Sequence, residues 1–222
     1  MKRCAVIGAS SGTGLALVRY LAGQQTTVRA ISRHPPEAAP FIEPFAADAT
    51  DARCITKGLG GEFDAVFYTV DVHGLFKPRK DIRAVMFQGC VNSIHAAAQA
   101  AVPPKFVLLS VIGPDRPSWV WWVLNMTKPG MQRNILDREE VLKDSGLSYI
   151  ICRAAKLNDD AGGTKPLAAT PPQHKLDMKR GISRADLARA LILAAERAPR
   201  NTTWDLFSDA NGPRQDWLLP TT

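Results

Sequence analysis

The chain has 222 residues, 45% of them hydrophobic, which is enough for one globular domain with a substantial core. The formal net charge is +7, a balance that favours anionic ligands such as phosphates and also suits a solvated basic surface. The basic residues are scattered, and because a nucleic-acid surface needs a concentrated basic face, the composition argues against nucleic-acid binding.

The hydrophobic pattern predicts strands alternating with helices. In chain order we expect a strand at residues 3–7, a helix at 13–22, a strand at 27–32, the end of a short strand at 45–48, a helix beginning over 51–57 and a strand at 64–69. Next come a long helix at 81–100, a strand at 105–110, a Pro/Trp-rich segment at 112–130, a helix at 131–144 and a strand at 148–153. An irregular stretch at 156–181 precedes a helix capped by Ser183 and a final strand at 203–207. This order predicts an α/β fold, with one domain over 1–222 and a mostly parallel sheet covered by helices on both faces.

A glycine-rich stretch, residues 8–14, connects the first strand to the first helix. Gly8 allows a sharp turn, Gly12 allows the backbone to approach a diphosphate, and Gly14 allows the helix to pack on the sheet. Free N–H groups at the helix start would face the phosphates, with hydroxyl donors from Ser10, Ser11 and Thr13. This context favours a dinucleotide site over a plain turn, and a P-loop is excluded because no Gly-Lys-Ser/Thr follows.

The end of the second strand carries no acidic residue and reads Ile31-Ser32-Arg33-His34. An acid there would bind the ribose hydroxyls of NAD, whereas Arg33 can pair with a 2′-phosphate and Ser32 can donate to the same group. We therefore predict NADP(H) rather than NAD, with a solvated arginine as the alternative. Asp48, at the end of the third strand, can accept from the adenine amino group or cap the next helix, and both interpretations stay open.

Further short motifs occur in order: Asp48-Ala49, Asn92, Ser110, Ser145-Gly146-Leu147-x-Tyr149 and Ile182-Ser183-x-x-Asp186-Leu187-Ala188. Together with the glycine loop and Ser32-Arg33, they make the chain resemble the atypical short-chain dehydrogenase/reductases with an NmrA-like, NAD(P)H-binding domain. Within that group it is most similar to the biliverdin-IXβ reductases, also called flavin reductases. The resemblance covers nearly the whole chain and implies a Rossmann-type, doubly wound fold with NADP(H) across the carboxyl ends of the strands.

The resemblance also implies roles for single residues. The cofactor would run along Asp48, Ala49, Thr69 and Val70, and its nicotinamide would lie near Ser110. Apart from the resemblance, the position of Arg153 after the sixth strand suits binding of the diphosphate or a carboxylate, or a structural ion pair. The position of Asn92 within a helix suits bracing of the backbone near the fourth strand. Where the related reductases carry a histidine after two prolines, this chain has two alanines and Lys156, so that histidine's role does not transfer.

The proton-donating pair of most short-chain dehydrogenases, Tyr-x-x-x-Lys, is missing from the sequence. None of Tyr20, Tyr68 and Tyr149 has a lysine four residues later. Ordinary carbonyl reduction is therefore not expected. Biliverdin-IXβ reductases also lack the pair, and hydride transfer to a conjugated, readily protonated acceptor can proceed without it.

The candidates for catalysis are Ser110, Lys156 and His73. Ser110 can bond a substrate carbonyl or the nicotinamide amide, Lys156 can donate a proton or bind an acidic group, and His73 follows the fourth strand. The alternative interpretations are that Ser110 only hydrogen-bonds the backbone, that Lys156 is solvated in a loop, and that His73 has no catalytic role. The substrate region would be formed by 71–80, 111–130 and 154–181. Its aromatic wall, or else a lid or dimer contact, would be formed by Trp119, Trp121, Trp122 and Met126.

These features favour an NADPH-dependent reductase of a flat conjugated acceptor: a flavin, quinone, tetrapyrrole or polyketide-like molecule. The alternatives are a non-redox biosynthetic enzyme, such as a cyclase or isomerase, and an NADP(H)-sensing regulator. The expected partner is a small molecule, and the protein would be a monomer or homodimer.

The four cysteines form no CxxC pair and no zinc-type cluster, so we expect no metal. The N-terminus lacks the apolar region of a signal peptide, and the most apolar run, residues 119–124, is too short to span a bilayer. We therefore expect a cytoplasmic protein with reduced thiols and no stable membrane insertion.

Overall fold

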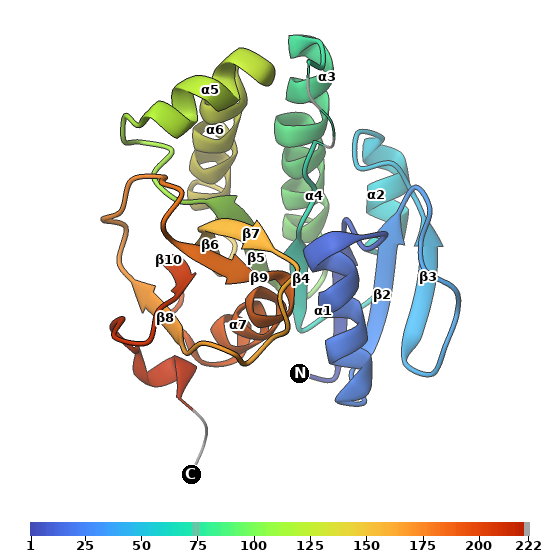
Figure 1. Cartoon of the computed structure of the whole chain (residues 1–222). Helices are drawn as coiled ribbons and strands as arrows, with labels where there is room; N and C mark the ends of the chain where they lie inside the picture. Colours follow the sequence, from blue (N-terminus) through green and yellow to red (C-terminus); the bar gives the residue numbers. More distant parts are fainter. Residues whose placement is uncertain (73, 75, 220–222) are drawn as a thin grey trace.

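The computed structural model describes residues 1–72, 74 and 76–219 and is built on an eight-stranded sheet (Figure 1). The strand order is β3-β2-β1-β4-β5-β6-β10-β8. The strands are β1 (Arg3–Ile7), β2 (Thr27–Ser32), β3 (Ile42–Ala46), β4 (Ala65–Tyr68), β5 (Lys105–Val111), β6 (Tyr149–Ala154), β8 (Leu167–Thr170) and β10 (Thr202–Ser208). All neighbours are parallel except β8, which is antiparallel to β10. The predicted mostly parallel sheet, with the strand order of a Rossmann fold, is confirmed.

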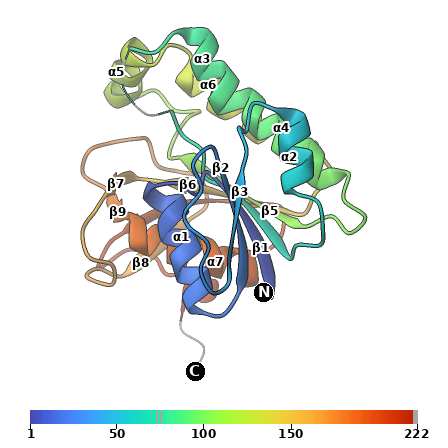
Figure 2. The same ribbon diagram turned by 90° about the vertical axis from the view of Figure 1, so that its right-hand side faces the viewer.

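Helices cover both faces of the sheet (Figure 2). On one face lie α1 (Gly12–Gly23) and α7 (Arg184–Arg197), and on the other lie α2 (Ala52–Gly58), α4 (Gly89–Ala98) and α6 (Met131–Lys143). Successive residues of β1 point to opposite faces, so Val6 packs in the α1/α7 core and Ile7 in the other. This double burial explains why β1 reads as a continuous apolar run.

The helix expected at 81–100 is interrupted by a π-helical segment. The structure has α3 (Arg79–Arg83), the π segment η1 (Ala84–Gln88) and then α4. The Gly89 N–H donates to the Ala84 carbonyl, five residues back, and two side chains from other elements bond the next carbonyls of the segment. The Tyr68 hydroxyl donates to Val85 at 3.2 Å, and Arg138 Nη1 donates to Met86 at 3.4 Å. Such segments occur frequently at functional sites.

The Pro/Trp-rich segment at 112–130, for which we expected no particular element, contains a helix, α5 (Trp119–Thr127). The Ser118 hydroxyl caps it by accepting from the Trp121 N–H. Trp121 is buried against Met86 and Ile135, whereas Trp119 and Trp122 are exposed. Among the described residues, no helix is long and apolar enough to cross a membrane.

The stretch expected to be irregular at 156–181 is also partly ordered. Besides β8, it contributes β7 (Lys156–Asn158), which pairs in parallel with β9 (Gly181–Ser183) in a separate two-stranded sheet. A short 3-10 helix, η2 (Asp216–Leu218), packs near α7.

Candidate active site

A cavity of about 240 Å³ opens at the carboxyl ends of β1, β2, β4, β5 and β6. It spans the point between β1 and β4 where the strand order reverses, which is the usual ligand position in open parallel sheets. The expected cofactor-binding residues that line it are Gly8, Ser10, Ser11, Gly12, Thr13, Ser32, Arg33, Asp48, Ala49, Thr69, Val70 and Ser110.

The glycine loop is fixed by close backbone contacts. Gly8 has a left-handed φ of +96°, and its N–H donates to the Ile31 carbonyl at 2.9 Å. A Cβ on Gly14 would lie only 2.1 Å from the Gly8 carbonyl oxygen. Gly14 does not line the cavity, but it lets α1 pack directly on the turn. The start of α1 is thereby held against the cavity.

Two hydroxyl groups in the cavity wall are buried without a hydrogen-bond partner among the described residues: Thr13 Oγ1 and Ser32 Oγ. Ser11 is the N-cap residue of α1, yet its side chain accepts none of the helix N–H groups. Buried polar atoms are rarely left unpaired in folded proteins. A dinucleotide, with its phosphate and ribose oxygens, fits this set of unpaired donors beside a helix N-terminus.

Arg33 and Arg29 differ in their surroundings at the end of β2. Arg33 is exposed, lines the cavity and has no hydrogen bond or ion pair with any residue in the described ranges. Arg29 donates to Glu43 and to the carbonyls of Gly58 and Gly60, so its guanidinium is occupied. Arg33 therefore remains available to an anion bound in the cavity.

The loop after β3 is held in place by side-chain hydrogen bonds. Asp48 accepts from the Thr50 N–H at 2.9 Å and the Thr50 hydroxyl at 2.8 Å, while Asp51 caps α2. The alternative that Asp48 caps this helix is therefore wrong. Asn92 donates to the carbonyls of Ala49 and Thr50 and so braces this loop. The expectation that it braces the backbone near the fourth strand is wrong.

Arg184 also lines the cavity, and no local sequence pattern predicted it. It is the first residue of α7, and its Nε lies 3.5 Å from where a Cβ on Gly12 would be. Its Nη1 forms an ion pair with Asp159 at 2.6 Å. The chain fold thus brings a second arginine beside the glycine loop, where phosphates would lie.

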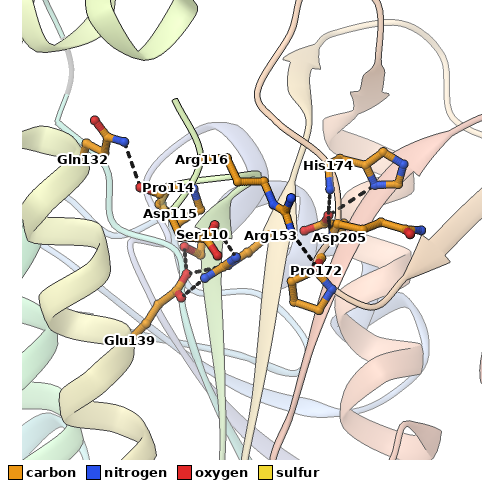
Figure 3. A network of polar contacts seen from close by, with 11 residues as sticks. Ser110, Pro114, Asp115, Arg116, Gln132, Glu139, Arg153, Pro172, His174 and Asp205 are labelled. Atoms are coloured by element: carbon orange, nitrogen blue, oxygen red, sulfur yellow. Dashed lines mark hydrogen bonds and ion pairs between the residues drawn. The ribbon is translucent and has the colours of Figure 1, made fainter. Parts of the chain in front are cut away.

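The Ser110 side chain belongs to a buried network of hydrogen bonds and ion pairs (Figure 3). Its hydroxyl donates to Glu139 Oε1 at 2.5 Å, and Arg153 Nη2 donates to Glu139 Oε2 at 2.7 Å. Asp115 pairs with Arg153 Nη1 at 3.2 Å. Burial lowers the pKa of Arg153, but the hydrogen bond and charge of Glu139 outweigh it, and the net effect raises the pKa. Arg153, expected as a cofactor contact, instead forms an ion pair behind Ser110 and does not line the cavity.

Other expected residues lie away from the cavity. Ala155 and Leu157 line it, but Lys156 between them is exposed on the opposite side, because successive strand residues alternate. The expected aromatic wall is absent from the cavity lining. Trp121 is in the core beneath α5, whereas Trp119, Trp122 and Met126 are exposed on α5 and do not line the cavity. His73 lies outside the described residues.

The titratable tyrosines and thiols are poor candidates for proton transfer. Tyr68 is fully buried, which raises its pKa well above 10, and no tyrosine lines the described part of the cavity. Burial raises the pKa of Cys4, Cys90 and Cys152 to about 12. No group of metal-binding side chains occurs within the described ranges.

Comparisons with solved structures support the fold. The oxidoreductase ylbE of Lactococcus lactis superposes with a TM-score of 0.76 and 17% identity, covering 95% of this chain and 92% of that one. An anaerobilin reductase, ChuY of Escherichia coli, superposes with a TM-score of 0.70 and 19% identity, covering 96% of this chain and 100% of that one. A protein assigned as an NADH-flavin reductase from Streptococcus pneumoniae superposes with a TM-score of 0.70 and 17% identity, covering 94% of this chain and 100% of that one.

Comparisons of sequence agree with this fold. The chain is 38% identical to sanguinarine reductase of Eschscholzia californica over 76 residues, which is 33% of this chain and spans 28% of that reductase. A family model described as NAD(P)H-binding matches residues 8–198, from the glycine loop to the end of α7. The chain therefore belongs to the NAD(P)H-binding family of Rossmann-fold proteins, as the resemblance implied.

Proposed function

We propose that the protein is an NADP(H)-dependent reductase of a flat conjugated acceptor such as a flavin, quinone, tetrapyrrole or polyketide-like molecule. The observation that carries the proposal is the division of the cavity into two ends. Unpaired polar groups surround the glycine loop and the end of β2, whereas apolar side chains from η1, β5 and β7 surround Ser110. The resemblance to reductases of flavins and bilins supports the same class.

The polar end suits the adenosine and diphosphate part of the cofactor. Thr13 and Ser32 offer unpaired hydroxyls, and Arg33 offers a guanidinium free of any described carboxylate. With no acid at the end of β2 to repel it, a 2′-phosphate can take a charge-assisted hydrogen bond from Arg33. These features favour NADP(H) over NAD(H).

The other end of the cavity, the apolar part around Ser110, is called the inner end. It suits a nicotinamide stacked on a planar acceptor. Val85, Met86, Val111 and Leu157 give apolar walls that exclude water and that flat rings can pack against. Bound NADPH would supply a hydride. Ser110, whose hydroxyl donates its proton to Glu139, would orient the nicotinamide by accepting a hydrogen bond from its amide N–H.

The contribution of the described residues would be positioning, and neither a tyrosine nor Lys156 would act as the acid. No tyrosine lines the described part of the cavity, and Lys156 is exposed outside it. An acceptor that takes its proton readily from water requires no side-chain acid. This limits the proposed substrates to conjugated molecules and sets aside simple ketones.

The test combines turnover with binding. NADPH oxidation would be followed at 340 nm with FMN, a simple quinone and biliverdin, beside titrations with NADPH and NADH. We expect turnover with at least one acceptor and tighter binding of NADPH. Tight binding without turnover would favour a sensor or a non-redox enzyme. No binding of either nucleotide would refute the assignment of residues 8–14.

A further inference from the structure

Arg138, on the inner face of α6, is a buried cation without a carboxylate partner. Only 2% of its surface is exposed. Nη1 donates to the Met86 carbonyl at 3.4 Å, Nη2 donates to the Leu109 carbonyl at 3.0 Å, and Nε has no partner within the described ranges. No ion pair of Arg138 occurs among those residues, in contrast to Arg153, which has two.

The anions nearest in the fold are already in use. Glu139, the next residue on α6, directs Oε1 to Ser110 and to Arg153 Nε, and Oε2 to Arg153 Nη2. Tyr68 and Cys90, which also feel the charge of Arg138, are neutral at physiological pH because burial raises both pKa values. Arg138 therefore has no carboxylate of its own among the described residues, and a buried cation without a counter-charge is costly unless something compensates for it.

The cavity wall is where this charge is accessible. Arg138 lines the cavity, and so do Met86 and Leu109, whose carbonyls hold its guanidinium. Ser110 lies next to Leu109 in the same wall. Surrounded by apolar side chains, a guanidinium attracts an anion far more strongly than it would in water. A ligand in the inner end of the cavity would therefore lie beside Arg138.

We propose that Arg138 makes the inner end of the cavity a binding subsite for an anionic oxygen of the acceptor. The proposal rests on the proposed function and adds a charge requirement to it. The oxygen is either a carboxylate substituent or a conjugated carbonyl oxygen. In the second case, hydride addition to the conjugated carbon moves the π electron pair onto the oxygen, leaving an enolate that water then protonates. Either oxygen compensates for the unpaired guanidinium.

The first experiment measures binding of benzoate and benzamide, which share shape and differ in charge. Dissociation constants would be determined by NMR titration with the full chain, both free and saturated with NADP⁺. We expect benzoate to bind at least about tenfold more tightly than benzamide, since a charge-assisted hydrogen bond contributes about 1.5–3 kcal/mol. R138M should abolish this preference, and R138K should keep part of it.

Arg133→Met is the matched control, because Arg133 lies on the same helix with its side chain 77% exposed and paired with Asp137. It should leave the benzoate preference unchanged. Thermal unfolding verifies that each variant is folded, and R138K tests the same charge if R138M does not fold. Equal binding of the two probes to the wild type, binding of neither, or a preference that survives R138M would overturn the proposal.

A second experiment separates the two sources of the anion. Turnover of anthraquinone-2-carboxylate and of the matching carboxamide would be compared in the wild type and R138M. A rise in KM for the carboxylate alone assigns the subsite to a fixed carboxylate, whereas a fall in kcat for both assigns it to the oxygen that gains charge. Unchanged kinetics for both compounds would count against the subsite. Failure of the proposed function is distinct, because it would appear as absent NADPH binding while the benzoate preference of the free protein stays.

Discussion

Gly14 and Gly23 lie on the same helix but differ in the space around them. A Cβ at position 14 would lie 2.1 Å from the Gly8 carbonyl oxygen, while one at position 23 would meet nothing within 4 Å. G14A should therefore destabilise the protein by about 1–3 kcal/mol or more and weaken nucleotide binding, because the loop must move. G23A should be neutral or slightly stabilising. Urea unfolding of both variants measures the difference, and equal stabilities would contradict the packing role of Gly14.

Arg33 is the residue on which cofactor preference depends in our proposal. R33A should weaken NADPH binding about tenfold and leave NADH binding nearly unchanged, because only NADPH carries the 2′-phosphate. Calorimetric titration of both nucleotides measures this. Arg19, an exposed arginine on α1 outside the cavity, provides the control variant R19A. If R33A weakened both nucleotides equally, Arg33 would not be contacting the 2′-phosphate.

At the scale of elements, Asp64 links the start of β1 to the loop before β4. Burial raises its pKa, but its hydrogen bonds from the Arg3 and Lys2 N–H groups outweigh burial and lower the pKa below 3.8. A lowered folded-state pKa adds stability above pH 3.8 that is lost as the pH falls through the folded-state pKa. D64N should thus be less stable than the wild type at pH 7. Urea unfolding between pH 7 and pH 2.5 should show that the difference in free energy of unfolding between the wild type and D64N becomes smaller as the pH falls. A difference that stays constant over this range would contradict the prediction.

The elements that the sequence predicted well are those whose signals are local. The strand at residues 3–7, the glycine loop and the cap at Ser183 each depend on neighbouring residues, and all are present. The π segment was not predicted because its freed carbonyls are bonded by Tyr68 and Arg138, which come from other elements. The helix α5 was not predicted, because prolines flank it and tryptophans within it do not mark a helix.

The candidate site divides in the same way. The residues of the glycine loop and Arg33 were found because the motif is contiguous in sequence. Glu139 was missed because it stands in a charged run, residues 137–140, that resembles a solvated helix face. Only the packing of α6 on β5 and β6 buries it, leaving 1% exposed. Arg184 was missed because it reaches Gly12 from the far end of the chain.

For the molecule as a whole, nucleotide binding should appear as added stability. At a concentration of NADP⁺ one hundred times its dissociation constant, the free energy of unfolding rises by about 2.7 kcal/mol, which for a domain of this size raises Tm by roughly 5–10 °C. The same concentration of NAD⁺ should give a smaller shift, and R33A should remove most of the difference. Differential scanning fluorimetry measures all of these shifts. Equal shifts for NAD⁺ and NADP⁺ with the wild type would contradict the proposed preference.

The pairing of β10 has a consequence for biosynthesis. This strand, the last along the described chain, lies between β6 and β8 and is the sheet partner of both. While the ribosome is still adding residues before 202, β6 has an open edge and β8 has no neighbour. Open edges of apolar strands invite pairing with other chains. The nascent protein can bury its interior around β1 early, but it remains prone to association until its final strand emerges.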